Sequence, residues 1–189
     1  KKLIQFGAGN IGRSFIGQIF SKEGYEVVFI DVNENLISEL NNKNEYKVII
    51  KRNNMQDTVL QIGNVRAIHA REIDRIKEEI VTADLISSSV GKGALNKIFP
   101  TLSKGLELRY NDDSDSSIDI IIAENIRNGA GFFRDELYKN LPKDFPIGNY
   151  VGLVETSIGK MVPIMKKEDI DIDPLWVFAE PYNQLILDK

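Results

Sequence analysis

A glycine-rich turn between an apolar segment and an amphipathic one constrains the fold of this chain more than any other feature. Residues 2–6 (KLIQF) have the apolar character of a buried strand, and Gly7-Ala8-Gly9-Asn10-Ile11-Gly12 follows directly. Residues 10–22 then carry apolar side chains at three- and four-residue spacing, which predicts a helix with one face on a sheet. The spacing G-x-G-x-x-G has a specific meaning when it joins a strand to a helix in this way.

The glycines predict a site for the pyrophosphate of a dinucleotide. Gly7 allows a tight turn, Gly9 leaves room for phosphate to approach the backbone, and Gly12 lets the helix pack closely on the strand. The helix N-terminus adds free N–H groups and a partial positive charge. Arg13 either lies over the pyrophosphate or is an ordinary exposed helix residue. The predicted phosphate site comprises Phe6, Gly7, Ala8, Gly9, Asn10, Ile11, Gly12 and Arg13.

An acidic residue after the next predicted strand strengthens this prediction. Residues 25–32 (YEVVFIDV) favour a central strand, and Asp31 near its end lies 19 positions after Gly12. A carboxylate there can accept hydrogen bonds from the adenosine ribose. It would repel a 2′-phosphate, and no Arg follows in residues 32–35, so we expect NAD rather than NADP as the cofactor. Two alternatives stay open: the glycines only shape a turn while Asp31 caps the next helix, or the cofactor is FAD, which needs a longer site.

Short apolar runs alternate with amphipathic stretches along most of the chain, which predicts an α/β fold with a doubly wound, mostly parallel Rossmann sheet. A β-hairpin inserted around the polar turn 52–54 interrupts this alternation. The polar stretch 107–117 predicts an exposed loop. The expected strands are 65–69, 83–90 and 118–123, with extended segments 150–155 and 175–178; the hairpin strands are 46–51 and 57–62; the expected helices are 34–42, 73–80, 94–104 interrupted at Pro100, and 127–141.

Composition excludes several functional classes. The chain has 189 residues, no Cys and one His, which excludes disulfides, thiolate metal sites and multi-histidine zinc sites. A net charge of −4 gives no basic surface for nucleic acid. No apolar run approaches the roughly 18 residues needed to span a membrane. We therefore expect a cytoplasmic protein with a small-molecule substrate and no metal; the acidic run 112–115 predicts a solvated loop.

Small and polar residues after two predicted strands are further candidates. Ser89-Val90-Gly91 ends the strand 83–90, where the ribose and nicotinamide of a cofactor would pass, or it is a plain strand-to-helix turn. Asn125 follows the strand 118–123 and can donate to a carbonyl oxygen, or it caps the next helix. Its neighbour Glu124 is expected to be a solvated or hydrogen-bonded residue rather than a catalyst. His69 is expected to be structural, near the sheet edge.

The motifs themselves resemble a known family. Residues 6–17 (FGAGNIGRSFIG) resemble the opening of the mannitol-1-phosphate dehydrogenases, within the polyol-specific long-chain dehydrogenase/reductase family. Three later stretches fit the same family in order: Asp31-Val32-Asn33, Ala123-Glu124-Asn125 and residues 151–163 (VGLVETSIGKMVP). The resemblance therefore covers nearly the whole chain.

This resemblance implies an NAD-dependent interconversion of a polyol phosphate and a ketose phosphate, with mannitol 1-phosphate and fructose 6-phosphate as the nearest pair. It places Asn125 in the oxyanion site and the general acid/base lysine in a helical C-terminal domain. Residues 1–189 are then expected to be the NAD-binding domain of a longer enzyme, with residues from about 150 leading to the missing domain. Such a chain should bind NAD without turnover.

One departure limits the expected substrate. This chain has Gly159-Lys160 where mannitol-1-phosphate dehydrogenases tend to have Asp-Arg, so the basic charge is kept and the carboxylate is lost. Lys160 either contacts the substrate or is a surface lysine. Hexuronate reductases and mannitol 2-dehydrogenases share the architecture and stay as alternatives. A non-catalytic NAD-sensing module is an alternative of another class, and the sequence does not fix the oligomeric state.

Overall fold

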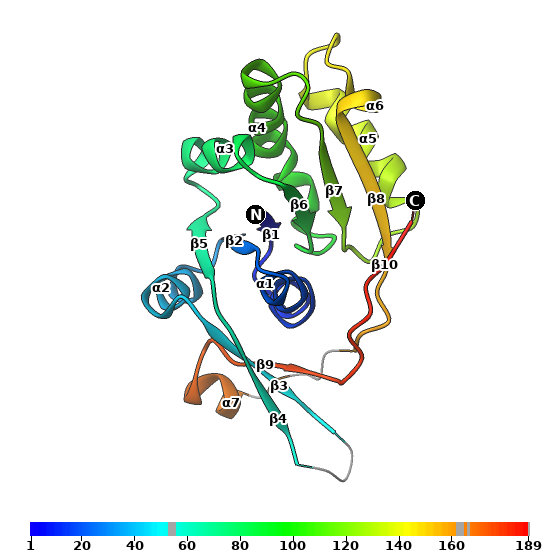
Figure 1. Ribbon diagram of the computed structural model, residues 1–189. Coiled ribbons are helices and arrows are strands. Elements are labelled where there is room, and N and C mark those ends of the chain that lie inside the picture. Colours follow the sequence, from blue (N-terminus) through cyan, green and yellow to red (C-terminus); the bar gives the residue numbers. More distant parts are fainter. Residues whose placement is uncertain (53–55, 162–164, 166, 189) are drawn as a thin grey trace.

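A twisted, mostly parallel sheet forms the centre of the computed structural model, which describes residues 1–52, 56–161, 165 and 167–188 (Figure 1). Within these residues the main sheet has seven strands in the order β10-β8-β7-β6-β1-β2-β5. All neighbouring pairs from β5 to β8 are parallel, and β10 runs antiparallel to β8. This order, with its reversal between β1 and β6, confirms the predicted doubly wound fold. The strands are β1 Lys2–Phe6, β2 Glu26–Asp31, β5 Val65–His69, β6 Leu85–Ser88, β7 Ile118–Ile122, β8 Val151–Ser157 and β10 Ile186–Leu187.

The central strands have apolar side chains on both faces, which suits a sheet with helices packed on each side. Successive side chains of a strand point to opposite faces, so Ile4, Val28 and Ile30 enter one apolar cluster. Leu3, Val27 and Phe29 enter the other. A continuous run of β-branched and aromatic residues therefore suits each central strand.

Helices form a layer on each side of the sheet (Figure 1). One layer holds α3 Ile73–Val81, α4 Phe99–Asp112 and α5 Gly129–Asn140. The other holds α2 Glu34–Lys43 and the helix after the glycine turn, where the π-helical segment η1 Gly12–Gly17 continues into α1 Gln18–Lys22. No helix in the described part of the chain is long and apolar enough to cross a membrane. Short helical pieces are η2 Leu95–Lys97, α6 Ile147–Tyr150 and α7 Lys167–Ile172.

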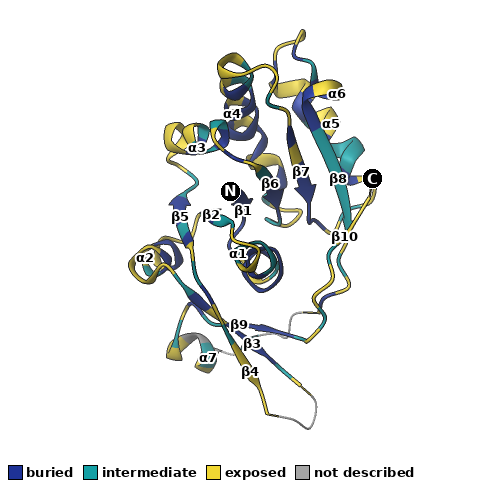
Figure 2. Cartoon of the chain, in the orientation of Figure 1, coloured by how far each residue is buried: buried dark blue, intermediate teal, exposed yellow. Residues whose placement is uncertain are grey.

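The predicted hairpin is confirmed and belongs to a second, small sheet. Strands β3 Tyr46–Ile50 and β4 Thr58–Ile62 pair antiparallel, and β9 Val177–Ala179 adds to β3 in parallel. Residues 53 and 54 of the predicted turn lie outside the described residues. The small sheet packs on the helix after the glycine turn, since Phe15, Tyr46 and Val177 share one apolar cluster. Its outer strand β4 is largely exposed (Figure 2).

The prediction of a loop over 107–117 is wrong for its first half. Helix α4 runs from Phe99 to Asp112, and Pro100 lies in its first turn, where a missing N–H costs nothing, rather than interrupting it. Leu106 and Arg109, three positions apart, both face inward and are buried. The polar composition of the stretch concealed this buried face.

Candidate functional site

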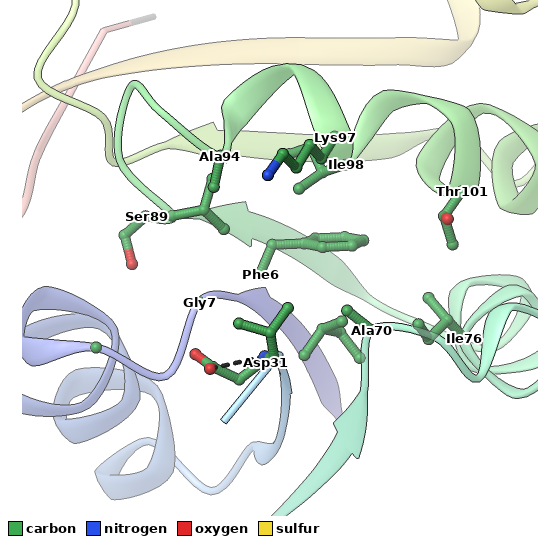
Figure 3. A pocket seen from close by; sticks show the side chains of 14 residues that line it. Phe6, Gly7, Asp31, Ala70, Ile76, Ser89, Ala94, Lys97, Ile98 and Thr101 are labelled. Atoms are coloured by element: carbon green, nitrogen blue, oxygen red, sulfur yellow. Dashed lines mark hydrogen bonds between the residues drawn. The ribbon is translucent and has the colours of Figure 1, made fainter. Parts of the chain in front are cut away.

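The carboxyl ends of the parallel strands enclose a cavity of about 280 Å³. Glycine-turn residues Gly7 and Gly9, the β2 end at Asp31, and the segment after β6 at Ser89 and Val90 contribute to its wall. Figure 3 shows these elements converging on one space between β1, β2 and the start of α4. Ligands of open parallel sheets bind at this position, outside the strand ends where the strand order reverses.

The glycine turn is shaped by close backbone approaches. The Gly7 N–H donates to the Ile30 carbonyl oxygen at 2.8 Å. Gly7 has a φ of +92°, and a Cβ there would lie 2.7 Å from the Ser89 carbonyl oxygen. A Cβ on Gly12 would overlap the Gly7 carbonyl oxygen, whereas a Cβ on Gly9 would meet nothing within 4 Å. Gly7 and Gly12 thus fit the turn to the helix, and Gly9 presents bare backbone to open space, as a bound phosphate requires.

Asp31 joins the glycine turn to the end of β2. Its Oδ2 accepts from the Ala8 N–H at 2.7 Å, and its Oδ1 accepts from the Val32 and Asn33 N–H groups at 2.7 and 3.0 Å. The alternative that Asp31 caps the next helix is wrong, because Asn33 caps α2 by accepting from the Leu36 N–H at 3.1 Å. The carboxylate lies at the cavity wall, and of its roughly four acceptor positions one, on Oδ2, is left for a ligand hydroxyl.

Arg13 supports the turn from its buried side. Only 6% of the residue is exposed, so the alternative of an exposed helix residue is wrong. Its Nε donates to the Ala8 carbonyl oxygen at 2.7 Å and a terminal nitrogen donates to the Leu175 carbonyl oxygen at 2.8 Å. Arg13 therefore ties the turn to the segment before β9. Arg13 thus supports the turn, and its contact with a phosphate stays a prediction.

The segment Ser89-Val90-Gly91 follows β6 directly and borders the cavity with its first two residues. Gly91 has a φ of +81°, in the left-handed region that favours glycine. Glu124 is buried and accepts from this segment, so the prediction of a hydrogen-bonded neighbour is confirmed. Asn125, the next residue, is exposed at the same sheet edge, and its contact with a substrate carbonyl stays a prediction.

Lys160 is buried, so the interpretation as a surface lysine is wrong. Its Nζ lies 3.3 Å from Gln18 Oε1, 3.2 Å from Asn183 Oδ1 and 5.4 Å from the Phe15 ring centre. Burial lowers the pKa of Lys160 to about 8, and the charge of Glu180 offsets only part of this effect. Lys160 thus packs on the helix after the glycine turn and is not part of the cavity wall; a substrate contact stays a prediction.

Sequence reasoning missed the other wall of the cavity. Ala94, Lys97, Ile98 and Thr101 line it from η2 and the start of α4, and Ala70 and Ile76 line it from β5 to α3. Figure 3 shows Lys97 and Ile98 opposite Asp31. The spacing of three and four residues between positions 94, 97, 98 and 101 was the available signal, since such positions share one face of a helical segment.

His69 and the acidic run 112–115 make local hydrogen bonds and do not line the cavity. His69 ends the edge strand β5, and its Nδ1 accepts from the Arg71 N–H at 3.1 Å. Asp113, in the acidic run, accepts from the Asp115 N–H at 3.0 Å. In the part of the chain that the structure describes, no group of three or more His, Asp or Glu residues is arranged to hold a metal ion.

Curated proteins with similar sequences cover nearly all of this chain. The chain is 32% identical to mannitol-1-phosphate 5-dehydrogenase of Lactiplantibacillus plantarum, over 98% of this chain and 48% of that protein. It is 36% identical to the enzyme of the same name from Bacillus licheniformis, over 98% of this chain and 48% of that protein. The chain thus spans about half the length of the curated relatives that it matches.

Solved structures agree on the fold. Mannitol 2-dehydrogenase of Pseudomonas fluorescens, in a ternary complex with NAD and D-mannitol, matches with a TM-score of 0.74 and 11% identity, over 100% of this chain and 49% of that one. An octopine dehydrogenase complex with NADH and L-arginine matches with a TM-score of 0.62 and 17% identity, over 97% of this chain and 40% of that one. The family model described as the mannitol dehydrogenase Rossmann domain matches residues 1–189. The chain therefore belongs to the mannitol dehydrogenase Rossmann domain family, as its sequence motifs indicated.

Proposed function

We propose that this chain binds NAD in the cavity at the carboxyl edge of the sheet. The observation that carries the proposal is the joint placement of Gly9 and Asp31 at one cavity, with bare backbone at one and a carboxylate at the other. The turn would hold the pyrophosphate, Asp31 the adenosine ribose, and the segment 89–91 would border the path to the nicotinamide. Asp31 would repel the extra phosphate of NADP, because like charges at close range disfavour binding.

The protein that contains this domain would interconvert a polyol phosphate and a ketose phosphate, with mannitol 1-phosphate and fructose 6-phosphate as the pair. This part of the proposal is supported by relatives with 31 to 36% identity that are named mannitol-1-phosphate 5-dehydrogenase. When bound, NAD would supply the hydride acceptor, and the hydroxyl proton would pass to the general acid/base lysine that the family resemblance places in the C-terminal domain. Asn125 would donate to the oxygen that becomes a carbonyl, and an amide can do so without taking up a proton.

Calorimetric titration with NAD and NADP tests the cofactor proposal. We expect the chain to bind NAD more tightly than NADP. Replacing Asp31 by Ala should weaken NAD binding about tenfold or more, which corresponds to the loss of one or two hydrogen bonds to a charged group. NADP should lose less, because its repulsion is removed too. Asp135→Ala, an exposed position on α5, is the matched control. NAD binding that survives Asp31→Ala unchanged would contradict the assigned role of Asp31.

Turnover by the whole protein tests the substrate proposal. We expect NADH to form from mannitol 1-phosphate and NAD, and far more slowly from mannitol, because the substrate phosphate would contribute binding energy to the reaction. Preference for mannitol or a hexuronate would move the assignment to those alternatives. Cofactor binding with no turnover of any of the three would favour the NAD-sensing module.

A further inference from the structure

The Glu124 carboxylate accepts three hydrogen bonds, one from the last side chain of β6 and two from the backbone that follows this strand. Its Oε1 accepts from the Ser88 hydroxyl at 2.6 Å and from the Val90 N–H at 2.7 Å, and its Oε2 accepts from the Gly91 N–H at 2.9 Å. The residue is buried, and the three donors lie 33 to 36 positions away in sequence. The carboxylate therefore acts as a clamp across two neighbouring strand ends.

We infer that Glu124 is the positioning residue for the nicotinamide half of the cofactor. The inference rests on the proposed function and names a residue that acts without touching the substrate. Ser89 is anchored without Glu124, because its N–H donates to the Phe6 carbonyl oxygen and Gln5 donates to its hydroxyl at 2.8 Å. The N–H groups of Val90 and Gly91 donate to Glu124 instead. The clamp therefore fixes the position of the second half of the segment 89–91.

A carboxylate at this place does two things that an amide cannot. It accepts from both N–H groups and the hydroxyl at once, whereas a Gln side chain would place an NH₂ against one of these donors. It also occupies N–H groups that would otherwise compete for the phosphates of a ligand. The phosphates are thus left to the glycine turn, and the segment 89–91 keeps one shape.

Backbone hydrogen bonds hold the candidate substrate-side residue, Asn125, next to the clamp. The Ala123 N–H donates to the Ser88 carbonyl oxygen at 2.9 Å and the Ile126 N–H donates to the Glu124 carbonyl oxygen at 3.0 Å. Asn125 stands between these bonds with its side chain exposed. The Glu124 side chain thus holds the segment 89–91, and these backbone bonds hold Asn125 beside it; hydride transfer requires such fixed positions.

Binding of two ligands to the same variants tests this inference. NADH contains both halves of the cofactor, and ADP contains only the adenosine and phosphate half. For Glu124→Gln we expect the Kd of NADH to rise about tenfold or more and the Kd of ADP to stay within about twofold. Ser88→Ala removes one donor and leaves both backbone bonds, so its Kd for NADH should rise less than about threefold.

Glu79→Gln is the matched control, because the Glu79 carboxylate also accepts three hydrogen bonds, here all from side chains. Glu79 lies on α3, close to the residues that begin β1 and β5 and away from the cavity. This variant should leave both Kd values unchanged, even where it lowers the melting temperature. An equal loss of NADH and ADP binding in Glu124→Gln, or unchanged NADH binding, would overturn the inference and leave the proposed function standing. A wild-type chain that binds neither ligand would overturn the proposed function and the inference with it.

Discussion

Two carboxylates hold the carboxyl ends of the strands in the same way, by accepting hydrogen bonds from the backbone that follows a neighbouring strand. Asp31, at the end of β2, accepts from the turn that follows the neighbouring strand β1. Glu124, just after β7, accepts from the segment that follows the neighbouring strand β6. Backbone N–H groups at strand ends have no ladder partner, and a carboxylate offers them several acceptor positions. Both acidic residues thus support the shape of the edge, and Asp31 additionally faces the cavity.

Lys160 gives a prediction at the residue scale, because its folded pKa of about 8 lies below the ordinary 10.5. Between these two pH values the unfolded chain binds more protons than the folded one, so stability should rise with pH. The rise should be about 1–2 kcal/mol once screening by water is allowed for. Urea unfolding from pH 7 to pH 10.5 measures it.

Lys160→Met separates this rise from other titrations, since Met fills a similar volume without a charge. Relative to this variant, the wild type should be least stable below pH 8 and should gain as the pH approaches 10.5. Parallel stability curves for the two proteins over this range would contradict the assignment.

At the scale of single elements, one buried arginine anchors the C-terminal part of α4. The Arg109 guanidinium donates to the carbonyl oxygens of Ile80, Val81 and Ala83 at 3.0, 2.7 and 2.8 Å. It also donates to the carbonyl and hydroxyl oxygens of Ser116. These acceptors lie at the end of α3 and in the turn after α4, so Arg109 joins both segments to the last turns of α4.

Arg109→Met should therefore destabilise the domain by about 3–5 kcal/mol, because it leaves several buried carbonyl oxygens without donors. Arg109→Lys should recover only part of this loss, since one ammonium cannot match the fork of five donors. Chemical denaturation measures both values, with the exposed Arg134→Met as control. A loss below about 0.5 kcal/mol in Arg109→Met would disprove this account of α4.

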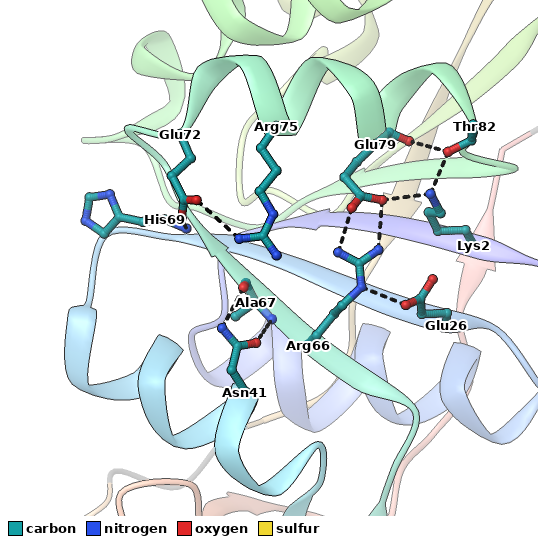
Figure 4. A network of polar contacts seen from close by, with 10 residues as sticks. All are labelled: Lys2, Glu26, Asn41, Arg66, Ala67, His69, Glu72, Arg75, Glu79 and Thr82. Carbon is teal, nitrogen blue, oxygen red and sulfur yellow. Dashed lines mark hydrogen bonds and ion pairs between the residues drawn. The ribbon is translucent and has the colours of Figure 1, made fainter.

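At the scale of the whole molecule, a stabilising polar network and the candidate site lie at opposite ends of the strands. Figure 4 shows the polar network in which Glu79 accepts from Arg66 and Lys2. Arg66 also donates to Glu26 at 2.7 Å, so the network links β1, β2, β5 and α3. These positions begin or flank the strands, whereas the cavity lies where the strands end.

Glu79→Gln should lower stability without touching the site. Burial alone would raise the pKa of Glu79, but hydrogen bonds from Arg66 and Lys2 outweigh it and lower the pKa to about 2. The contribution is therefore fully present above the ordinary pKa of 4.5 and lost as the pH falls toward 2. At pH 7 we expect a loss of about 1–2 kcal/mol for this partly exposed group. Unfolding curves at pH 7 and pH 2.5 measure it; an equal loss at both would contradict the ion-pair account.

The sequence predicted most of the fold because the signals are local. Each central strand is a run of β-branched and aromatic residues, such as Val27 to Ile30, and this run predicts a buried strand. Each helix has an apolar face, as Ile76 and Ile80 show for α3, and this spacing predicts which side is buried. The glycine turn was equally clear, since Gly7 and Gly12 meet backbone requirements of the turn and Gly9 leaves bare backbone at the cavity. The helix beyond position 106 was missed because its buried face contains Arg109, whose partners are distant in sequence.

The sequence by itself determined the doubly wound sheet, the inserted hairpin, the family and the glycine turn, because periodicity and short motifs depend on near neighbours. Only the tertiary structure decided the pairing of β9 with β3, the burial of Arg13 and Lys160, and the clamp formed by Glu124. Each of these joins segments more than 30 residues apart. Their cost or benefit is set by desolvation and partner geometry, which no local pattern encodes.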